Sequence, residues 1–273
     1  MLSDITFGQF YPGRSFVHRL DPRTKILGTL IFVSAIFLAE NYLAYLSLIG
    51  FTAATVASSR LPVRLIVRAF RPLLPILFIT LAIHLFMTPG EVLGQMWFLT
   101  VTYEGLRLGV LMSLRLILLI VMSSMLTYTT SPIVLTDGIE RLLRPFRRFG
   151  VPAHEIAMMM TIALRFIPTL LEETDKIIKA QTARGADFAS GHLFRRARNM
   201  VPLLVPLFVS AFRRADELAT AMEARCYRGG ESRTRLRELK FCWEDGFAAA
   251  AMLALVAILS ILRFAAPGFP GTA

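Results

Sequence analysis

Two arginine residues carry the side chains best suited to recognition chemistry, because each closes a long helical pattern in nearly the same way. The two endings consist of Ala183, Arg184 and Gly185, and of Ala224, Arg225 and Cys226. A guanidinium presents N–H donors in a planar fork that matches carboxylate and carbonyl oxygens. An arginine at the tip of a projecting helix can therefore enter an acidic or carbonyl-lined groove on a partner protein.

Helix capping is a second explanation of the same two endings. A basic side chain interacts favourably with the carbonyl groups of the last helical turn, and Gly185 can adopt the left-handed conformation that ends a helix. Capping explains each copy separately but does not require a repeat. The spacing alone leaves capping and docking open.

The two endings belong to a weak internal repeat. Aligning Arg184 with Arg225 also pairs acidic, small and apolar residues. The pairs are Asp175 with Asp216, Ala180 with Ala221, Ile167 with Phe208, Leu171 with Phe212, and Ile177 with Leu218. The repeat suggests that the chain uses the same device twice.

A single long helix is predicted over residues 154–184, where apolar or small side chains recur three and four positions apart. Such a helix would be about 45 Å long at 1.5 Å per residue, which exceeds the hydrocarbon core of a bilayer. Its second half contains Glu172, Glu173, Lys176 and Lys179 and is too charged for lipid. We therefore expect this half of the helix to leave the membrane.

Enzymatic motifs are missing from the sequence. It has no Gly-x-Ser-x-Gly, no His-Glu-x-x-His and no Walker A sequence. We predict no catalytic residues, no bound cofactor and no metal site, so that any ATP would be bound by a partner subunit. Cys226 and Cys242 have no neighbouring metal-ligand pattern and are interpreted as small residues.

Composition indicates a protein that crosses the membrane several times. Hydrophobic residues make up 55% of the chain, and the mean hydropathy is +0.59. The net charge of +11 could suggest nucleic acid as a partner. However, Lys and Arg are missing from residues 38–59 and 72–106 and gather in the segments between, as the positive-inside rule describes. We therefore predict that the chain lies in a lipid bilayer and that it binds no nucleic acid.

The predicted fold is an all-α membrane protein with about five transmembrane helices and long cytoplasmic coupling helices. The predicted spans are residues 26–39, 42–58, 73–87, 106–128 and 246–262. An amphipathic helix over residues 131–150 is expected to lie along the cytoplasmic surface. The predicted organisation is a membrane region (1–128), a cytoplasmic or interfacial region (129–244) and a final span with its tail (245–273).

Four motifs, in this order along the chain, resemble the transmembrane (T) component of energy-coupling factor transporters, the prokaryotic importers of cobalt and vitamins. They are Leu20-Asp21-Pro22-Arg23-Thr24-Lys25, Leu164-Arg165-Phe166-Ile167-Pro168, Ala183-Arg184-Gly185-Ala186-Asp187 and Glu223-Ala224-Arg225-Cys226-Tyr227. The set is specific, although no single motif decides the resemblance. It covers nearly the whole chain.

The resemblance implies a non-catalytic scaffold in the prokaryotic cell membrane, with its N-terminus and coupling helices in the cytoplasm. In that family two ABC-type ATPase subunits bind ATP, and a small membrane S component captures the vitamin or metal ion. The residues implied to dock the ATPases are Ala183, Arg184, Gly185, Ala224, Arg225 and Cys226. The alternative is a membrane anchor for another cytoplasmic regulator. The transported substrate is not encoded in this chain, because the S component determines it.

One docking motif departs from the family pattern. Cys226 stands where glycine is common, and cysteine tolerates the left-handed conformation poorly. The sequence therefore leaves open whether the second helix ends in the same cap as the first.

Overall fold

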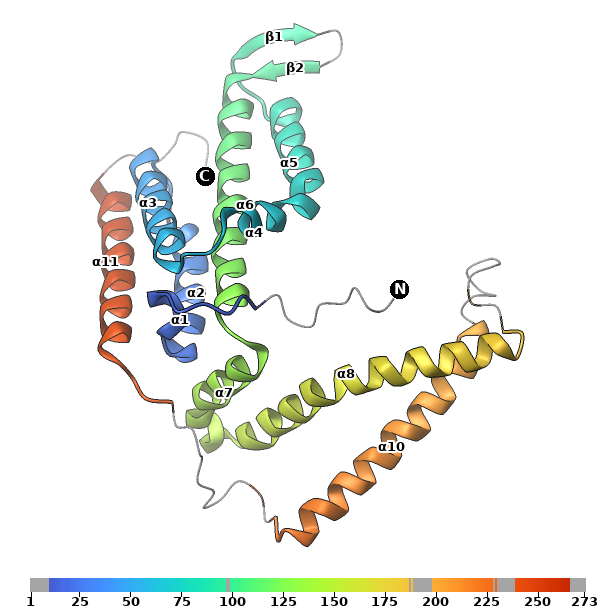
Figure 1. Cartoon of the computed structure of the whole chain (residues 1–273). Helices are drawn as coiled ribbons and strands as arrows, with labels where there is room; N and C mark the ends of the chain where they lie inside the picture. The colour runs from blue at the N-terminus through green and yellow to red at the C-terminus, as the bar shows by residue number, and fades with distance from the viewer. Residues whose placement is uncertain are drawn as a thin grey trace. The chain divides into compact units, whose positions relative to one another are not determined.

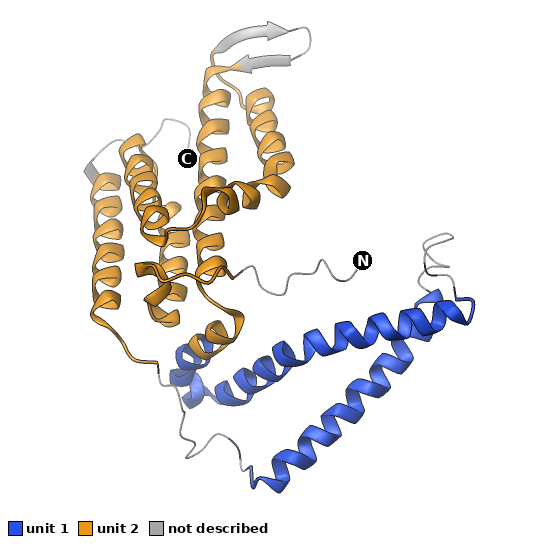
Figure 2. Ribbon diagram, in the orientation of Figure 1, with its two compact units in different colours: residues 1–8, 139–238 blue, residues 9–138, 239–273 orange. Residues whose placement is uncertain are grey.

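A computed structural model describes residues 10–96, 99–186, 188, 198–227, 229 and 239–265 (Figure 1). The chain forms two compact units, which Figure 2 colours separately. Unit 2 contains residues 9–138 and 239–273, and unit 1 contains residues 139–238 together with 1–8. These units are defined by contacts within the chain, so the membrane and cytoplasmic boundaries expected at 128 and 244 remain predictions.

Helices make up almost all of the described structure. Those of unit 2 are α1 (Phe16–Arg19), α2 (Pro22–Ile36), α3 (Tyr42–Ser59), α4 (Val63–Phe70), η1 (Arg71–Leu73), α5 (Leu74–Met87), α6 (Tyr103–Thr129) and α11 (Trp243–Ala265). Helix α7 (Pro132–Leu143) runs from unit 2 into unit 1, which continues with η2 (Arg144–Phe149), α8 (Ala153–Ala183) and α10 (Val201–Ala224). The predicted all-α membrane fold is confirmed.

Five helices of the described chain are long and apolar enough to cross a membrane: Tyr42–Ser59, Val63–Met87, Tyr103–Thr129, Ala153–Ala183 and Trp243–Phe264. The number matches the prediction, but the set differs in one member. The predicted span 26–39 corresponds to α2, which has only 15 residues and ends at Ile36. The fifth candidate by length and composition is the long helix α8, because its first half is sufficiently apolar.

A β-hairpin joins α5 to α6, between the predicted spans 73–87 and 106–128. Its strands β1 (Val92–Met96) and β2 (Leu99–Thr102) pair antiparallel, with an irregularity between Val92 and Gly94. Thr102 then caps α6, because its hydroxyl accepts a hydrogen bond from Gly105 N at 3.2 Å. The hairpin is short, so the fold class is unchanged.

The core of unit 2 lies among α2, α3, α6 and α11. Phe32 and Ile36 of α2, Leu48 of α3 and Leu259 of α11 are completely buried in one cluster, and Leu118 of α6 joins them. Lipid is as apolar as these side chains, so close van der Waals packing is the main attraction between such helices. The four helices therefore form a firm bundle from which the other elements extend.

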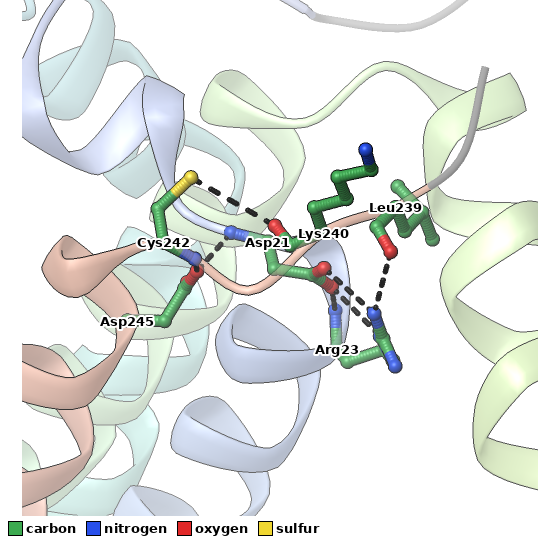
Figure 3. A network of polar contacts seen from close by, with 6 residues as sticks. All are labelled: Asp21, Arg23, Leu239, Lys240, Cys242 and Asp245. Carbon is green, nitrogen blue, oxygen red and sulfur yellow. Dashed lines mark hydrogen bonds and ion pairs between the residues drawn. The ribbon is translucent and has the colours of Figure 1, made fainter.

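A polar network fastens the start of α2 to the start of α11 (Figure 3). Asp21 caps α2 by accepting a hydrogen bond from Arg23 N at 2.9 Å, with Pro22 at the first helical position. Asp245 accepts hydrogen bonds from Asp21 N and Cys242 N, each at 2.8 Å. Arg23 in turn donates to Leu239 O at 3.2 Å. The network thus holds the segment that leads into the last helix.

Candidate docking site at the ends of two helices

The end of α8 is closed by its own backbone. Gly185 has φ +88, and its N–H donates to Thr182 O at 2.9 Å. The N–H of Ala186 reaches back to Gln181 O at 3.0 Å. These two bonds, with a left-handed residue between them, form a Schellman motif, which satisfies carbonyls that a helix end would otherwise leave unpaired.

The end of α10 has the same geometry, although its left-handed residue is a cysteine. Cys226 has φ +55, its N–H donates to Glu223 O at 2.8 Å, and Tyr227 N donates to Met222 O at 3.1 Å. The two ends therefore match in backbone as well as in sequence. The question that the sequence left open about Cys226 is answered: the second helix ends in the same cap.

Neither arginine side chain takes part in these caps. Arg184 and Arg225 are exposed, as are the four other predicted docking residues. Within the described residues, neither guanidinium makes a hydrogen bond or an ion pair; the capping bonds come from backbone N–H groups. The two guanidinium groups are thus available to a partner. The backbone carbonyls of the caps beside them already accept hydrogen bonds from backbone N–H groups.

The two helices are held together through Glu173 of α8. Its carboxylate accepts hydrogen bonds from the Ser210 hydroxyl and from Arg214 Nη2, the latter at 2.8 Å. This part of α8 lies beyond its apolar half. Glu173 is therefore paired with both a hydroxyl group and a cation of α10.

The contact between Glu173 and Arg214, where α8 crosses α10, joins equivalent positions of the sequence repeat. Glu173 and Arg214 are equivalent positions when Arg184 is aligned with Arg225, and each of these arginines follows its crossing residue by 11 positions. Figure 1 shows α8 and α10 running in opposite directions, so their arginine-bearing ends lie at opposite ends of the pair. The repeat could have predicted this contact, since its offset brings an acid and a base to equivalent positions.

Comparison with known proteins identifies the family. Residues 13–236 match the CbiQ family, described as cobalt transport protein. A relative from Acidaminococcus fermentans, named energy-coupling factor transporter transmembrane protein EcfT, is 60% identical over 98% of this chain and 100% of its own length. The chain belongs to this CbiQ/EcfT family. The resemblance found in the four sequence motifs is confirmed.

Other EcfT relatives agree with this assignment. A protein from Ruminiclostridium cellulolyticum is 58% identical over 88% of this chain and 90% of its own length. One from Bacillus subtilis is 47% identical over 96% of this chain and 100% of its own length. The CbiQ match includes both arginine-tipped helices but stops before α11. As a transporter transmembrane component with several apolar helices, the chain is a multi-pass membrane protein.

Other polar groups of the described chain form no comparable site. The described residues contain no group of three or more His, Cys, Asp or Glu that could hold a metal ion. His154 Nδ1 lies 3.1 Å from Glu140 Oε1, which ties the start of α8 to α7 within one stretch of chain. Cys226 and Cys242 are both free thiols on the surface.

The cysteine at the second helix end leads to a stability prediction. A side chain in the left-handed conformation costs roughly 1 kcal/mol, which glycine avoids. We expect Cys226→Gly to stabilise the end of α10 by about 0.5–1 kcal/mol and to slow hydrogen exchange of the Tyr227 amide. Cys242→Gly is the matched control, because Cys242 is not among the positive-φ residues. Equal or faster exchange at Tyr227 after Cys226→Gly would show that the cysteine is not strained.

The crossing leads to a second prediction, which concerns the separation of the two helix ends. Glu173→Lys puts two positive charges together, and a partly exposed ion pair contributes only about 0.2–1 kcal/mol, so we expect a looser crossing rather than unfolding. Spin labels at Thr182 and Glu223, measured by pulsed electron paramagnetic resonance, should show a broader distance distribution. Combining Glu173→Arg with Arg214→Glu should narrow it again. The exposed neighbour Glu172, changed to Lys, serves as the control; a distribution that broadened as much for Glu172→Lys would contradict the assignment.

Proposed function

We propose that this chain is the transmembrane scaffold of an energy-coupling factor importer of the ABC class. In this proposal two cytoplasmic ATPase subunits bind and hydrolyse ATP, and a small membrane S component captures a vitamin or a metal ion. The chain itself is non-catalytic and binds no cofactor. Helices α8 and α10, called the coupling helices below, carry the movement of the ATPases to the membrane.

The pair of exposed arginine tips carries the proposal. Each lies about 16 Å beyond the crossing, from 11 residues at 1.5 Å per residue. Because the helices run in opposite directions, the tips are held roughly 30 Å apart. A single groove cannot receive both, whereas two equivalent subunits can each receive one. The matching caps and the equal distances from Glu173 and Arg214 support two equivalent ATPase contacts.

The chemistry of the tips indicates what the ATPase grooves should contain. Arg184 and Arg225 offer planar donors, and the neighbouring Ala183, Gly185, Ala224 and Cys226 are small enough to let a groove close around the guanidinium. Carboxylate or carbonyl oxygens on the ATPase would complete the contact. The helix behind each tip is continuous, so a displacement of the tip moves the whole helix.

The apolar surface of α10 supports a membrane-embedded partner. The helix exposes Leu204, Val205, Phe208, Val209 and Phe212. Side chains of this size need lipid or another apolar protein surface as their neighbour. We assign this role to the S component and the surrounding lipid. The charge distribution supports an orientation with the N-terminus and the coupling helices in the cytoplasm.

Copurification tests the proposal. The chain, expressed from its native locus with an affinity tag and extracted in mild detergent, should bring down two ATPase subunits and a small hydrophobic protein. ATP-driven uptake should then be restored in vesicles that contain this complex. A stable complex with a cytoplasmic regulator and no ATPase would instead support the membrane-anchor alternative. The substrate is determined by identifying the ligand of the copurified S component.

A further inference from the structure

Two arginines of α6 lie against aromatic rings at the turn between α2 and α3. The Arg107 guanidinium carbon is 5.0 Å from the centre of the Tyr42 ring, and that of Arg115 is 5.4 Å from the centre of the Phe37 ring. Both aromatic residues remain largely uncovered, with exposed fractions of 57% for Tyr42 and 58% for Phe37. The turn thus carries two cations and two exposed aromatic faces.

This turn lies at the level of a membrane interface. Glu40 pairs with Arg263 of α11 at 3.0 Å, and Asn41 donates to Leu262 O at 2.8 Å. Asp245, at the other end of α11, belongs to the polar network of Figure 3. The helix between Asp245 and Arg263 extends roughly 27 Å, which is close to the hydrocarbon thickness of a bilayer. Two polar layers therefore bound the bundle, and the α2–α3 turn belongs to the layer opposite the network.

Arg115 lies close to the same layer. Thr129 O, at the far end of α6, accepts a hydrogen bond from Lys25 at 3.0 Å near the start of α2. Arg115 precedes Thr129 by 14 residues, or about 21 Å of helix. Its side chain then extends to Phe37, which follows the last residue of α2. The guanidinium consequently lies just below the polar layer, and Arg107 lies two helical turns closer to solvent.

Arg115 lacks an anion of its own. Its Nε atom is buried and has no hydrogen-bond partner, and no acidic side chain of the described chain pairs with it. By contrast, Arg263 in the same layer is neutralised by Glu40. An arginine at the edge of the hydrocarbon region requires a negative group, because the desolvation of its charge is otherwise uncompensated.

We propose that Arg115 binds the phosphate of an anionic phospholipid at this turn. A phosphodiester offers several oxygens to a planar guanidinium, and basic residues between membrane helices bind lipid headgroups in this way. Tyr42 and Phe37 suit the interface, where aromatic rings are enriched. The exposed Leu43 and Leu46 that follow on α3 provide apolar surface for the acyl chains. Phosphate binding does not depend on the proposed transport function. With the N-terminus in the cytoplasm, as proposed above, this turn lies at the outer leaflet.

Native mass spectrometry of the full-length chain in neutral detergent tests this site. Phosphatidylglycerol should remain bound at higher collision energy than a diacylglycerol with the same acyl chains, which lacks the phosphate. Arg115→Gln should weaken the apparent affinity for phosphatidylglycerol about tenfold, as expected when a charge-assisted contact is lost. Arg115→Lys should be intermediate, because an ammonium keeps the charge but not the fork. Arg68→Gln removes one exposed arginine elsewhere in unit 2 and should leave this binding unchanged.

Three results would overturn the proposal. The wild-type chain could retain diacylglycerol as well as phosphatidylglycerol, a comparison that needs no variant. Arg115→Gln could bind phosphatidylglycerol as the wild type does, with the same unfolding temperature in lipid-free detergent. Arg115→Gln could also keep the lipid but release a small membrane protein from the copurified complex, which would identify a partner carboxylate as the anion.

Discussion

The double variant Arg184→Ala, Arg225→Ala should insert in the membrane normally and lose both ATPase association and ATP-driven uptake. The caps of α8 and α10 consist of backbone hydrogen bonds, so neither helix end needs the arginine side chain to satisfy its carbonyls. An arginine acting only on the helix dipole would contribute about 0.3–1 kcal/mol at an exposed end. An arginine in a groove can cost 2 kcal/mol or more when it is truncated, because its partner oxygens are left unpaired. Two such losses would weaken binding by roughly a thousandfold or more.

Matched variants separate docking from a general effect of charge. Arg213 and Lys179 are exposed on the same two helices, and replacing both by Ala removes the same charge. ATPase binding to that control should stay near the wild-type level. Single Arg→Lys changes at 184 or 225 should impair binding too, since lysine serves a helix end but cannot reproduce a planar fork. Wild-type uptake by the double Ala variant at equal expression would leave an interaction with the helix dipole as the role of both arginines.

The features predicted correctly from the sequence were those with local causes. The long helix that ends at Arg184 follows from the spacing of its apolar residues alone. The apolar stretches located four of the five candidate spans because each is a continuous run of suitable length. The repeat around Arg184 and Arg225 was visible because both copies lie in the same sequence context.

The features that sequence reasoning missed depend on contacts between distant segments. Asp245 appears in the sequence as an acidic residue before a span, and only the fold brings it to Asp21 N. Glu173 and Arg214 look like ordinary charges on solvated helices until α8 meets α10. The left-handed conformation of Cys226 contradicts its intrinsic preference, because the hydrogen bonds of the cap outweigh a local cost of roughly 1 kcal/mol. The hairpin was missed because its strands are only five and four residues long.

Replacing Asp245 by Ala should produce a large loss of stability in unit 2. The Asp245 side chain belongs to a residue that is only 4% exposed, and its two oxygens accept bonds from Asp21 N and Cys242 N. The substitution leaves both N–H groups without their acceptor, at a cost of about 1–3 kcal/mol for each that stays buried. We expect a total of about 2–4 kcal/mol, seen as a lower unfolding temperature in detergent.

The neighbouring residue provides the control for this prediction. Glu244 also lies in the first turn of α11, but it makes only a 3.7 Å ion pair with the exposed Arg19. Its replacement by Ala should cost less than about 1 kcal/mol. Asp245→Asn should fall between the two, since an amide keeps one acceptor oxygen but loses the charge. Equal destabilisation by Glu244→Ala and Asp245→Ala would mean that helix charge, and not the bonds to Asp21 and Cys242, stabilises this end of the bundle. Asp245 lies away from both arginine tips in sequence and in its contacts, so the folded fraction of Asp245→Ala should still bind the ATPases. The double arginine variant should instead fold normally and lose ATPase association.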